Sequence, residues 1–210
     1  LGGLIAFREE VLAPVRSQVG LLAMSLASQI NSIQQSGRDL SGNAGQAFFS
    51  IPPVVVQSSG LNAGSASLSA SVTSIGQLTG DNYRAVADGA GGFSLYTQPG
   101  NTAVSAASVG LTISLSGTAA AGDTFLIKPT DGVAAGLTMS LSTPAQIAAA
   151  SSAGTFGVGD NSNALRMAAV ENDRVLFGGT TSLAAGMQNL VSEMASTVRS
   201  SEVSVASQSL

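Results

Sequence analysis

The sequence lacks two side chains on which much of protein catalysis and metal binding depends. None of its 210 residues is His or Cys. Their absence excludes a serine triad, a cysteine nucleophile, a disulfide and a zinc site built on either side chain. Carboxylates are the remaining acid–base groups, so the chemistry open to this chain is narrow.

Charged and aromatic side chains are also scarce. Only 10% of residues are charged, against about 25% in ordinary soluble proteins, and Lys128 is the single lysine. Aromatic residues make up 4%, with no Trp, and the net charge is −4. Without a basic stripe or a stacking platform, we expect no nucleic-acid partner. Apolar runs such as Val19–Met24 are far shorter than the roughly 20 residues of a spanning helix, so we expect no membrane partner.

The first 36 residues have the period of a helix. Their apolar positions recur every three or four residues and predict a helix of about 22 residues after Pro14. Gly20 would mark a close helix crossing, and Gly37 would end the helix in a left-handed conformation. The apolar stripe consists of Val15, Val19, Leu22, Leu26, Ile30 and Ile33.

Residues 161–208 have the same period. Asp160–Asn163 offer N-cap side chains, Gly178–Gly179 break the pattern, and Thr180–Ser182 can cap a final helix. The apolar stripe of that final helix consists of Leu183, Met187, Leu190, Met194, Val198 and Val205. The chain therefore ends, as it begins, in helix.

Residues 65–141 alternate apolar and small polar residues between glycine-rich breaks, which is typical of strands. Asp88–Gly92 predicts a hairpin loop, and Gly117–Asp123 would join two paired strands. Thr143–Pro144 would open a short helix over Ala145–Ala150. Because no internal segment could supply crossover helices, we expect mostly antiparallel pairing. The expected strands are Leu68–Val72, Tyr83–Ala87, Phe93–Tyr96, Val109–Leu115, Phe125–Lys128 and Leu137–Leu141.

This order of elements predicts an α+β fold. Two helical segments remote in sequence can bury their apolar faces against each other. We therefore expect a discontinuous helical bundle or rod domain of residues 1–49 and 157–210. The mostly antiparallel β domain, residues 50–156, would be inserted into it.

Two carboxylate-containing segments resemble functional sites. Glu9 and Glu10 are adjacent on a helix, so they point about 100° apart and cannot share one site; a solvated helix face explains them. Asp160–Asn163 resembles a set of calcium ligands, but it lacks the glycine and the distal Glu of an EF-hand loop. Helix capping explains that segment better.

Three other patterns have structural explanations too. Asp88–Gly92 is glycine-rich but lies between strands, whereas a phosphate loop needs a helix N-terminus. Lys128 ends a strand without a visible partner, and Met187 and Met194 are expected to fill a core. We assign no catalytic, cofactor-binding or metal residue, expect no cofactor, and predict that the chain is not an enzyme.

Six segments, in order along the chain, resemble the flagellar hook-associated protein 1 family, which forms the hook–filament junction of bacteria. They are LGGLIAFREEVLAP (Leu1–Pro14), GRDLSGNAGQAFF (Gly37–Phe49), GDTFLIKPT (Gly122–Thr130), IAAAS (Ile147–Ser151), GDNSNALRMAAV (Gly159–Val170) and LVSEM (Leu190–Met194). The chain opens at Leu1 with no visible signal peptide, so we expect an interior fragment of the longer family protein, without its terminal segments.

The resemblance implies a structural subunit, exported through the flagellar secretion channel and assembled outside the cell. Its implied partners are other copies of itself through lateral packing, the hook protein, and the second hook-associated junction protein. An export chaperone is implied for the missing C-terminal segment.

Other readings stay open at this stage. Another axial component, such as the second junction protein or a flagellin-like subunit, is one, although the β insertion and the GDNSNA segment favour the first junction protein. The β domain could instead be an extracellular binding or adhesin module on a helical stalk. A two-carboxylate glycosidase would need an aromatic-lined cleft, and this chain has few aromatics to build one.

Overall fold

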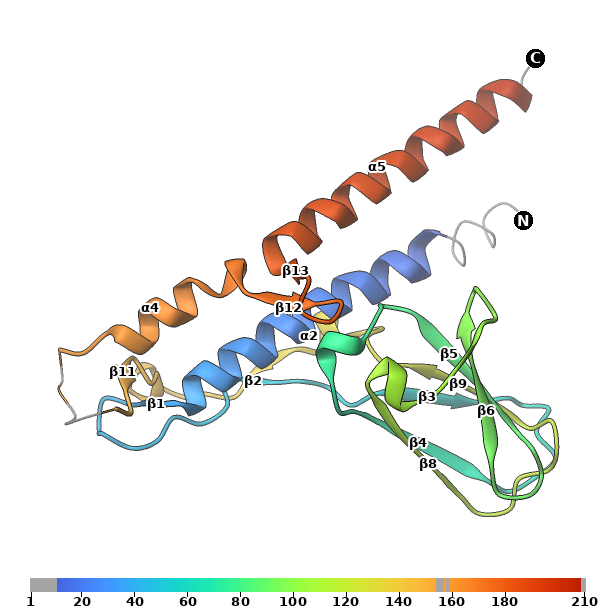
Figure 1. The fold of residues 1–210 in the computed structure, drawn as a ribbon, viewed down its shortest axis with the longest axis horizontal. Helices are drawn as coiled ribbons and strands as arrows, with labels where there is room; N and C mark the ends of the chain where they lie inside the picture. Colours follow the sequence, from blue (N-terminus) through green and yellow to red (C-terminus); the bar gives the residue numbers. More distant parts are fainter. Residues whose placement is uncertain (1–10, 154–156, 158, 209–210) are drawn as a thin grey trace.

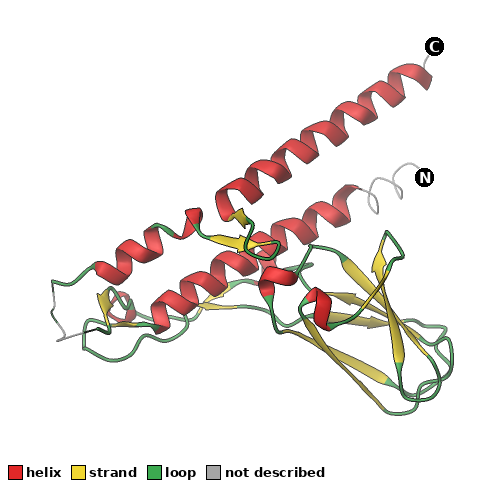
Figure 2. Cartoon of the chain, in the orientation of Figure 1, coloured by secondary structure: helices red, strands yellow, loops and turns green. Residues whose placement is uncertain are grey.

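A computed structural model describes residues 11–153, 157 and 159–208 and combines long helices with antiparallel sheets. This confirms the α+β class. Figure 1 shows the two longest helices lying side by side, with most of the strands gathered beyond one of them. Figure 2 shows the same separation by secondary structure, with short helical turns beside the strands.

The helices lie close to the predicted positions. The first long helix runs over 23 residues with Pro14 in its first turn, as the sequence predicts. The short helix expected over Ala145–Ala150 is only a 3₁₀ turn with a Thr143–Gln146 capping box, because Ala150 joins a strand. The helices are α2 (Ala13–Gln35), α3 (Val133–Gly136), α4 (Ser162–Ala168) and α5 (Leu183–Gln208), with 3₁₀ turns η2 (Ile75–Gln77), η3 (Ala107–Val109), η4 (Pro144–Gln146) and η5 (Val170–Asn172).

The strands form one five-stranded sheet and four two-stranded sheets, and every pair among the described residues is antiparallel. The large sheet has the order β3-β9-β5-β6-β7, and β4 pairs with β8. The strands are β1 (Gly37–Arg38), β2 (Phe49–Ser50), β3 (Val55–Ser58), β4 (Ser67–Val72), β5 (Asn82–Ala87), β6 (Phe93–Gln98), β7 (Ala103–Val104), β8 (Leu111–Ser116), β9 (Thr124–Lys128), β10 (Thr138–Met139), β11 (Ala150–Ser151), β12 (Arg174–Leu176) and β13 (Thr181–Ser182).

The hairpin across Asp88–Gly92 is confirmed. β5 pairs with β6 on either side of it, and Gly89 and Gly91 adopt φ of 76° and 94°. The Asp88 carboxylate accepts the Ala90 and Gly92 N–H groups, which lowers the pKa of Asp88. This loop is a structural turn.

The predicted pairing of Phe125–Lys128 with the preceding strand is wrong. β8 pairs with β4, whereas β9 lies between β3 and β5 in the other sheet. The intervening segment turns away because the Asp123 carboxylate accepts N–H groups from Ala63, Gly64 and Ala120, at 2.8 to 3.0 Å. These bonds tie the segment to the loop before β4 and carry the chain from one sheet to the other.

Acidification should weaken this turn. The Ala120 N–H, followed by those of Ala63 and Gly64, lowers the pKa of Asp123 below its ordinary value. A depressed folded-state pKa adds stability above the unfolded value of about 3.9, and that stability is lost as the pH falls through the folded pKa. We expect Asp123→Asn to unfold more easily than the parent chain at neutral pH. We also expect it to lose less stability than the parent chain when the pH is lowered from neutral to below the folded-state pKa of Asp123.

Urea unfolding at a series of pH values measures this difference. Asp88 and Asp160 also have lowered pKa values, so the parent chain must be the reference at every pH. Equal pH dependence of the two proteins would contradict the role given to Asp123.

Gly37 does not end α2 in a left-handed conformation as predicted. It lies in β1 and pairs with Ser151 of β11. A Cβ on Gly37 would lie 2.7 Å from the Ala148 oxygen and 2.8 Å from the Ala150 oxygen. Glycine is needed here for a close approach between strands and not for a turn.

The hydrophobic core is continuous between helices and sheets. Leu21 and Met24 of α2 belong to the same buried cluster as Tyr83, Phe125 and Ile127 of the large sheet. From the C-terminal part of the chain, the cluster includes Val170, Leu176 and Leu183. α2 therefore has the sheets on one side and the returning helices on another.

Candidate assembly surface

The buried face of α2 matches the predicted apolar stripe only in part: Ile33 is buried, and Leu22 and Ile30 pack against the core. Leu21, Met24 and Ala27 are buried together with Gly20, whereas Val19 and Leu26 are 37% and 44% exposed. The prediction that Leu26 is a core residue is therefore wrong. The small residues of α2 face the rest of the chain, because small side chains let neighbouring segments come closest to the helix backbone.

Gly20 illustrates this approach. A Cβ at this position would overlap the carbonyl oxygen of Thr130, which follows β9. The close contact predicted for Gly20 is thus present, but its partner is a loop backbone and not a second helix.

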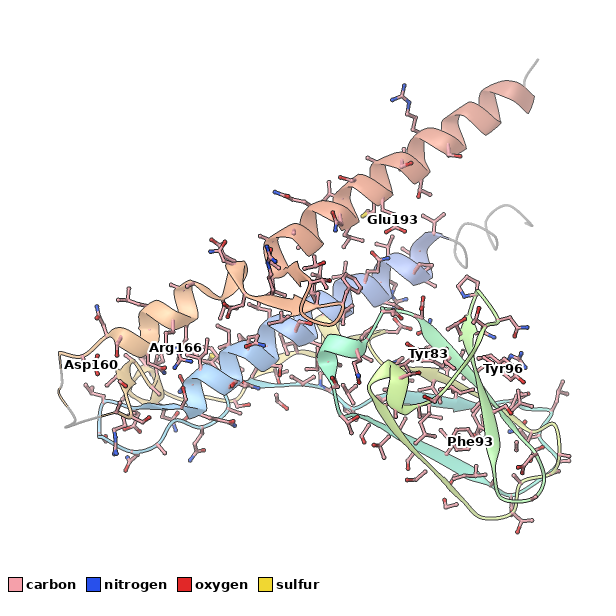
Figure 3. All side chains as sticks on the ribbon, in the orientation of Figure 1. Tyr83, Phe93, Tyr96, Asp160, Arg166 and Glu193 are labelled. Atoms are coloured by element: carbon pink, nitrogen blue, oxygen red, sulfur yellow. The ribbon has the colours of Figure 1, made fainter. Side chains whose placement is uncertain are left out.

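α5 packs against α2 in the antiparallel direction. A Cβ at Gly186 would lie 3.0 Å from Leu22 Cδ2, and Leu190 is only 4% exposed. Gln18 Nε2 donates a hydrogen bond to Glu193 Oε2 at 3.2 Å, and Figure 3 shows Glu193 on the side of α5 toward α2. The contact follows a seam at alternating three- and four-residue steps: Leu183, Gly186, Leu190 and Glu193.

A second apolar stripe on α5 is uncovered. Met187, Val191 and Met194 each follow a seam position by one residue, Val198 lies four residues beyond Met194, and the four side chains are 42% to 58% exposed. The expectation that Met187 and Met194 fill a core is therefore wrong. Their spacing of four, three and four residues is that of a helix-packing seam.

Exposed apolar residues of α2 extend this stripe. In an antiparallel pair, residues one step after the seam lie on the same side of both helices. Val19 follows Gln18 in this way, and Leu12 and Leu26 lie seven residues to either side of Val19. We call this surface the assembly face; it consists of Leu12, Val19, Leu26, Met187, Val191, Met194 and Val198. A contiguous exposed apolar surface of this kind marks an interaction site.

Two buried amide side chains join the far end of α2 to the returning chain. Gln34 Nε2 donates to the Gln146 oxygen at 2.7 Å, and Gln34 Oε1 accepts the Ala148 N–H at 3.0 Å. Asn163 Nδ2 donates to the oxygens of Ile33 and Ala148 at 2.9 and 2.6 Å. We call Gln34 and Asn163 the amide clamp; sequence reasoning missed it, although Asn163 belongs to the quoted GDNSNA segment.

The capping role expected of Asp160–Asn163 belongs mainly to Asp160. Its carboxylate accepts the N–H groups of Ser162 and Ser151, each at 2.9 Å, and the Ser162 group is the main cause of a lowered pKa at Asp160. Asn163 is 2% exposed and faces inward. The segment organises the start of α4.

The remaining site candidates from the sequence, Lys128 among them, are not arranged for catalysis or metal binding in the part of the chain that the structure describes. Lys128 Nζ lies 3.4 Å from Asp131 Oδ2, and Arg16 Nη2 lies 3.5 Å from Asp131 Oδ1, so an ion-pair network accounts for the lysine. Glu9 and Glu10 lie outside the described residues. Within the described ranges, no cluster of three or more carboxylates could hold a metal ion, and no helix has the length and hydropathy to cross a membrane.

Comparison with known proteins gives consistent matches. A family model described as the flagellar hook-associated protein FlgK helical domain matches residues 1–49. Flagellar hook-associated protein 1 of Escherichia coli is 26% identical over 99% of this chain and 39% of its own length. The same protein of Salmonella typhimurium is 30% identical over 86% of this chain and 35% of its own length. The chain thus spans well under half of these relatives.

A solved structure has the same fold. The flagellar hook junction protein FlgK of Burkholderia pseudomallei matches with a TM-score of 0.89 and 22% identity, over 99% of this chain and 60% of that one. The agreement covers both the helices and the sheets.

Proposed function

Because this chain corresponds to a segment of the flagellar hook-associated protein 1 family, we propose that it is part of a structural subunit that joins the hook to the filament of the bacterial flagellum. The observation that carries the proposal is a relationship in sequence and in fold along 99% of the chain. The subunit would catalyse no reaction, and its role would be mechanical.

We further propose the division into a helical rod domain, residues 1–49 and 157–210, and an inserted β domain, residues 50–156. The packing of α5 and α4 on α2 supports the first, and the amide clamp closes its far end. The shared core around Leu21 and Met24 would hold the β domain firmly on the rod.

The proposed partners follow from the family and from the assembly face. Copies of the subunit would pack laterally through that face, between the hook protein on one side and the second hook-associated junction protein on the other. The low content of charged residues supports close packing of subunits, because few like charges on neighbouring copies would repel each other. We also propose that the subunit is exported through the flagellar channel and is located outside the cell. An export chaperone would bind a C-terminal segment of the longer protein.

A charge on the assembly face tests this role. In the full-length protein, Val191→Asp places a carboxylate on the face, whereas Asn189→Asp places one on the opposite exposed side of α5. We expect the Val191 variant to be folded and exported but to abolish filament growth in a strain lacking the parent gene. The Asn189 variant should restore swimming.

Electron microscopy of the filaments and swimming in soft agar measure the outcome. Normal filaments with the Val191 variant would remove the assembly face from the proposal. A tagged full-length protein found away from the hook–filament boundary would overturn the junction role itself.

A further inference from the structure

A row of paired residues crosses the large sheet on the face opposite its core. Arg84 of β5 pairs with Leu126 of β9 on one side and with Tyr96 of β6 on the other. Gln57 of β3 pairs with Leu126 and extends the row to the sheet edge. Phe125, next to Leu126 in the chain, is buried in the core. Because successive side chains of a strand point to opposite faces, the row lies on the face away from that core.

The Arg84 guanidinium is held in place from two sides. Its Nη2 donates a hydrogen bond to Asn101 Oδ1 at 2.7 Å, and its Cζ lies 5.1 Å from the centroid of the Tyr96 ring. Within the part of the chain that the structure describes, its other N–H groups have no acceptor and Arg84 forms no ion pair. The cation is therefore oriented, but its charge is not neutralised.

The free N–H groups fit a carboxylate. A guanidinium presents two pairs of parallel N–H groups, Nε with Nη2 and Nη1 with Nη2, and each pair matches the two oxygens of a carboxylate. Asn101 uses only one Nη2 hydrogen, so one of the two pairs stays free. The single positive charge of Arg84 balances one carboxylate, whereas a phosphate ester carries about −1.5 to −2 at neutral pH.

The space next to Arg84 indicates what carries that carboxylate. Arg84 lines a hollow of about 320 Å³, near the lower limit of roughly 300 Å³ for small-molecule sites. The other polar side chains of this hollow include Gln57, Gln98 and Thr124, and none of the lining residues is acidic. Amide and hydroxyl groups both donate and accept hydrogen bonds, as sugar hydroxyls do. The aliphatic side chain of Leu126 lies between Gln57 and Arg84 and offers a surface for C–H groups.

We propose that this hollow binds a sugar that carries a carboxylate, namely a uronic acid unit of an acidic polysaccharide. The carboxylate would accept two parallel hydrogen bonds from Arg84, and the C–H face of the sugar ring would lie on Leu126. Its hydroxyls would exchange hydrogen bonds with the surrounding amide and hydroxyl side chains. The inference goes beyond the proposed junction role, because no residue of this hollow belongs to the assembly face.

Titration of the 210-residue chain with trigalacturonate and with trimannuronate tests the proposal, with calorimetry as the readout. The fully methyl-esterified forms of both are matched probes that keep the hydroxyls and remove the negative charge. Tricarballylate is the opposite probe, because it has three carboxylates and no sugar ring. We expect at least one of the two uronates to bind about tenfold more tightly than its ester and than tricarballylate.

Asn101→Asp is the most informative variant. It places a carboxylate against the guanidinium with almost no change of shape, and Asp tolerates the φ of 51° found at this position. The internal carboxylate should compete with the ligand and weaken binding about tenfold, as should Arg84→Gln. Asn189→Asp and Arg174→Gln make the same charge changes at exposed positions outside the hollow and should bind as the parent chain does.

Thermal unfolding of the free variants separates a loss of binding from a loss of folding. Asn101→Asp should melt no lower than the parent chain, because its new carboxylate faces a cation. Absence of binding of both uronates at millimolar concentration would overturn the proposal. Equal binding of the esters or of tricarballylate would contradict it, and so would uronate binding that Asn101→Asp leaves unchanged. None of these results depends on assembly through α2 and α5, so the junction role is tested separately.

Discussion

Leu190→Asp should unfold most of the chain, whereas Val191→Asp should leave it folded. The two residues are neighbours on α5, but Leu190 is buried against α2 and Val191 is 58% exposed. An unpaired carboxylate in the helix seam would cost about 4 kcal/mol or more, a large part of the 5–15 kcal/mol that stabilises a typical domain. An exposed substitution usually changes stability by less than about 0.5 kcal/mol.

Urea denaturation followed by circular dichroism compares the two variants with the parent chain. A similar loss in both would mean that Val191 is covered in the monomer. No loss at Leu190 would mean that α5 does not pack on α2. Together with the filament assay, the pair separates a folding defect from an assembly defect.

Gly20→Ala should destabilise the chain even though Ala is the better helix former. Propensity alone favours Ala by about 1 kcal/mol. The new Cβ would overlap the backbone oxygen of Thr130, and neither α2 nor the end of β9 can move without disturbing the shared core. Overpacking costs about 1–3 kcal/mol, occasionally more, and an overlap with backbone lies at the upper end of that range. After the gain in helix propensity is subtracted, we expect a net loss of about 2 kcal/mol.

Gly186→Ala is the matched helical control. Its nearest neighbours are the tips of the Leu176 and Leu22 side chains, which can rotate. The measured unfolding free energy of Gly186→Ala should fall by less than that of Gly20→Ala. The reverse order would show that side-chain packing between α2 and α5 is tighter than the contact with Thr130.

The positions of helices and strands followed from the sequence because they depend on local periods. α2 and the hairpin between β5 and β6 lie where the apolar spacing and the glycines of the loop predict. The partners of β8 and β9 did not follow, because the alternation in these two strands is compatible with several pairings. Two of the three hydrogen bonds of Asp123 that separate these strands, those from Ala63 and Gly64, connect residues about 60 positions apart in sequence.

The assembly face could be recognised only in part. Its residues were visible as apolar stripes, but α5 carries two adjacent stripes of the same period, one through Leu190 and one through Val191. Which of the two is buried depends on where small residues such as Gly186 let α2 approach. The amide clamp gave even less signal, because polar residues at helix ends are more often exposed or capping.

The amide clamp also orders events during folding. It joins residues 112, 114 and 130 positions apart, so its hydrogen bonds close very long loops. The β5–β6 hairpin needs only neighbouring residues and can form early, since the entropy of closing a loop rises with its length. In the proposed export route, the clamp closes only after Gln34 and Asn163 have both left the channel. The rod domain would therefore complete its folding at the growing tip, next to the subunits that have already assembled there.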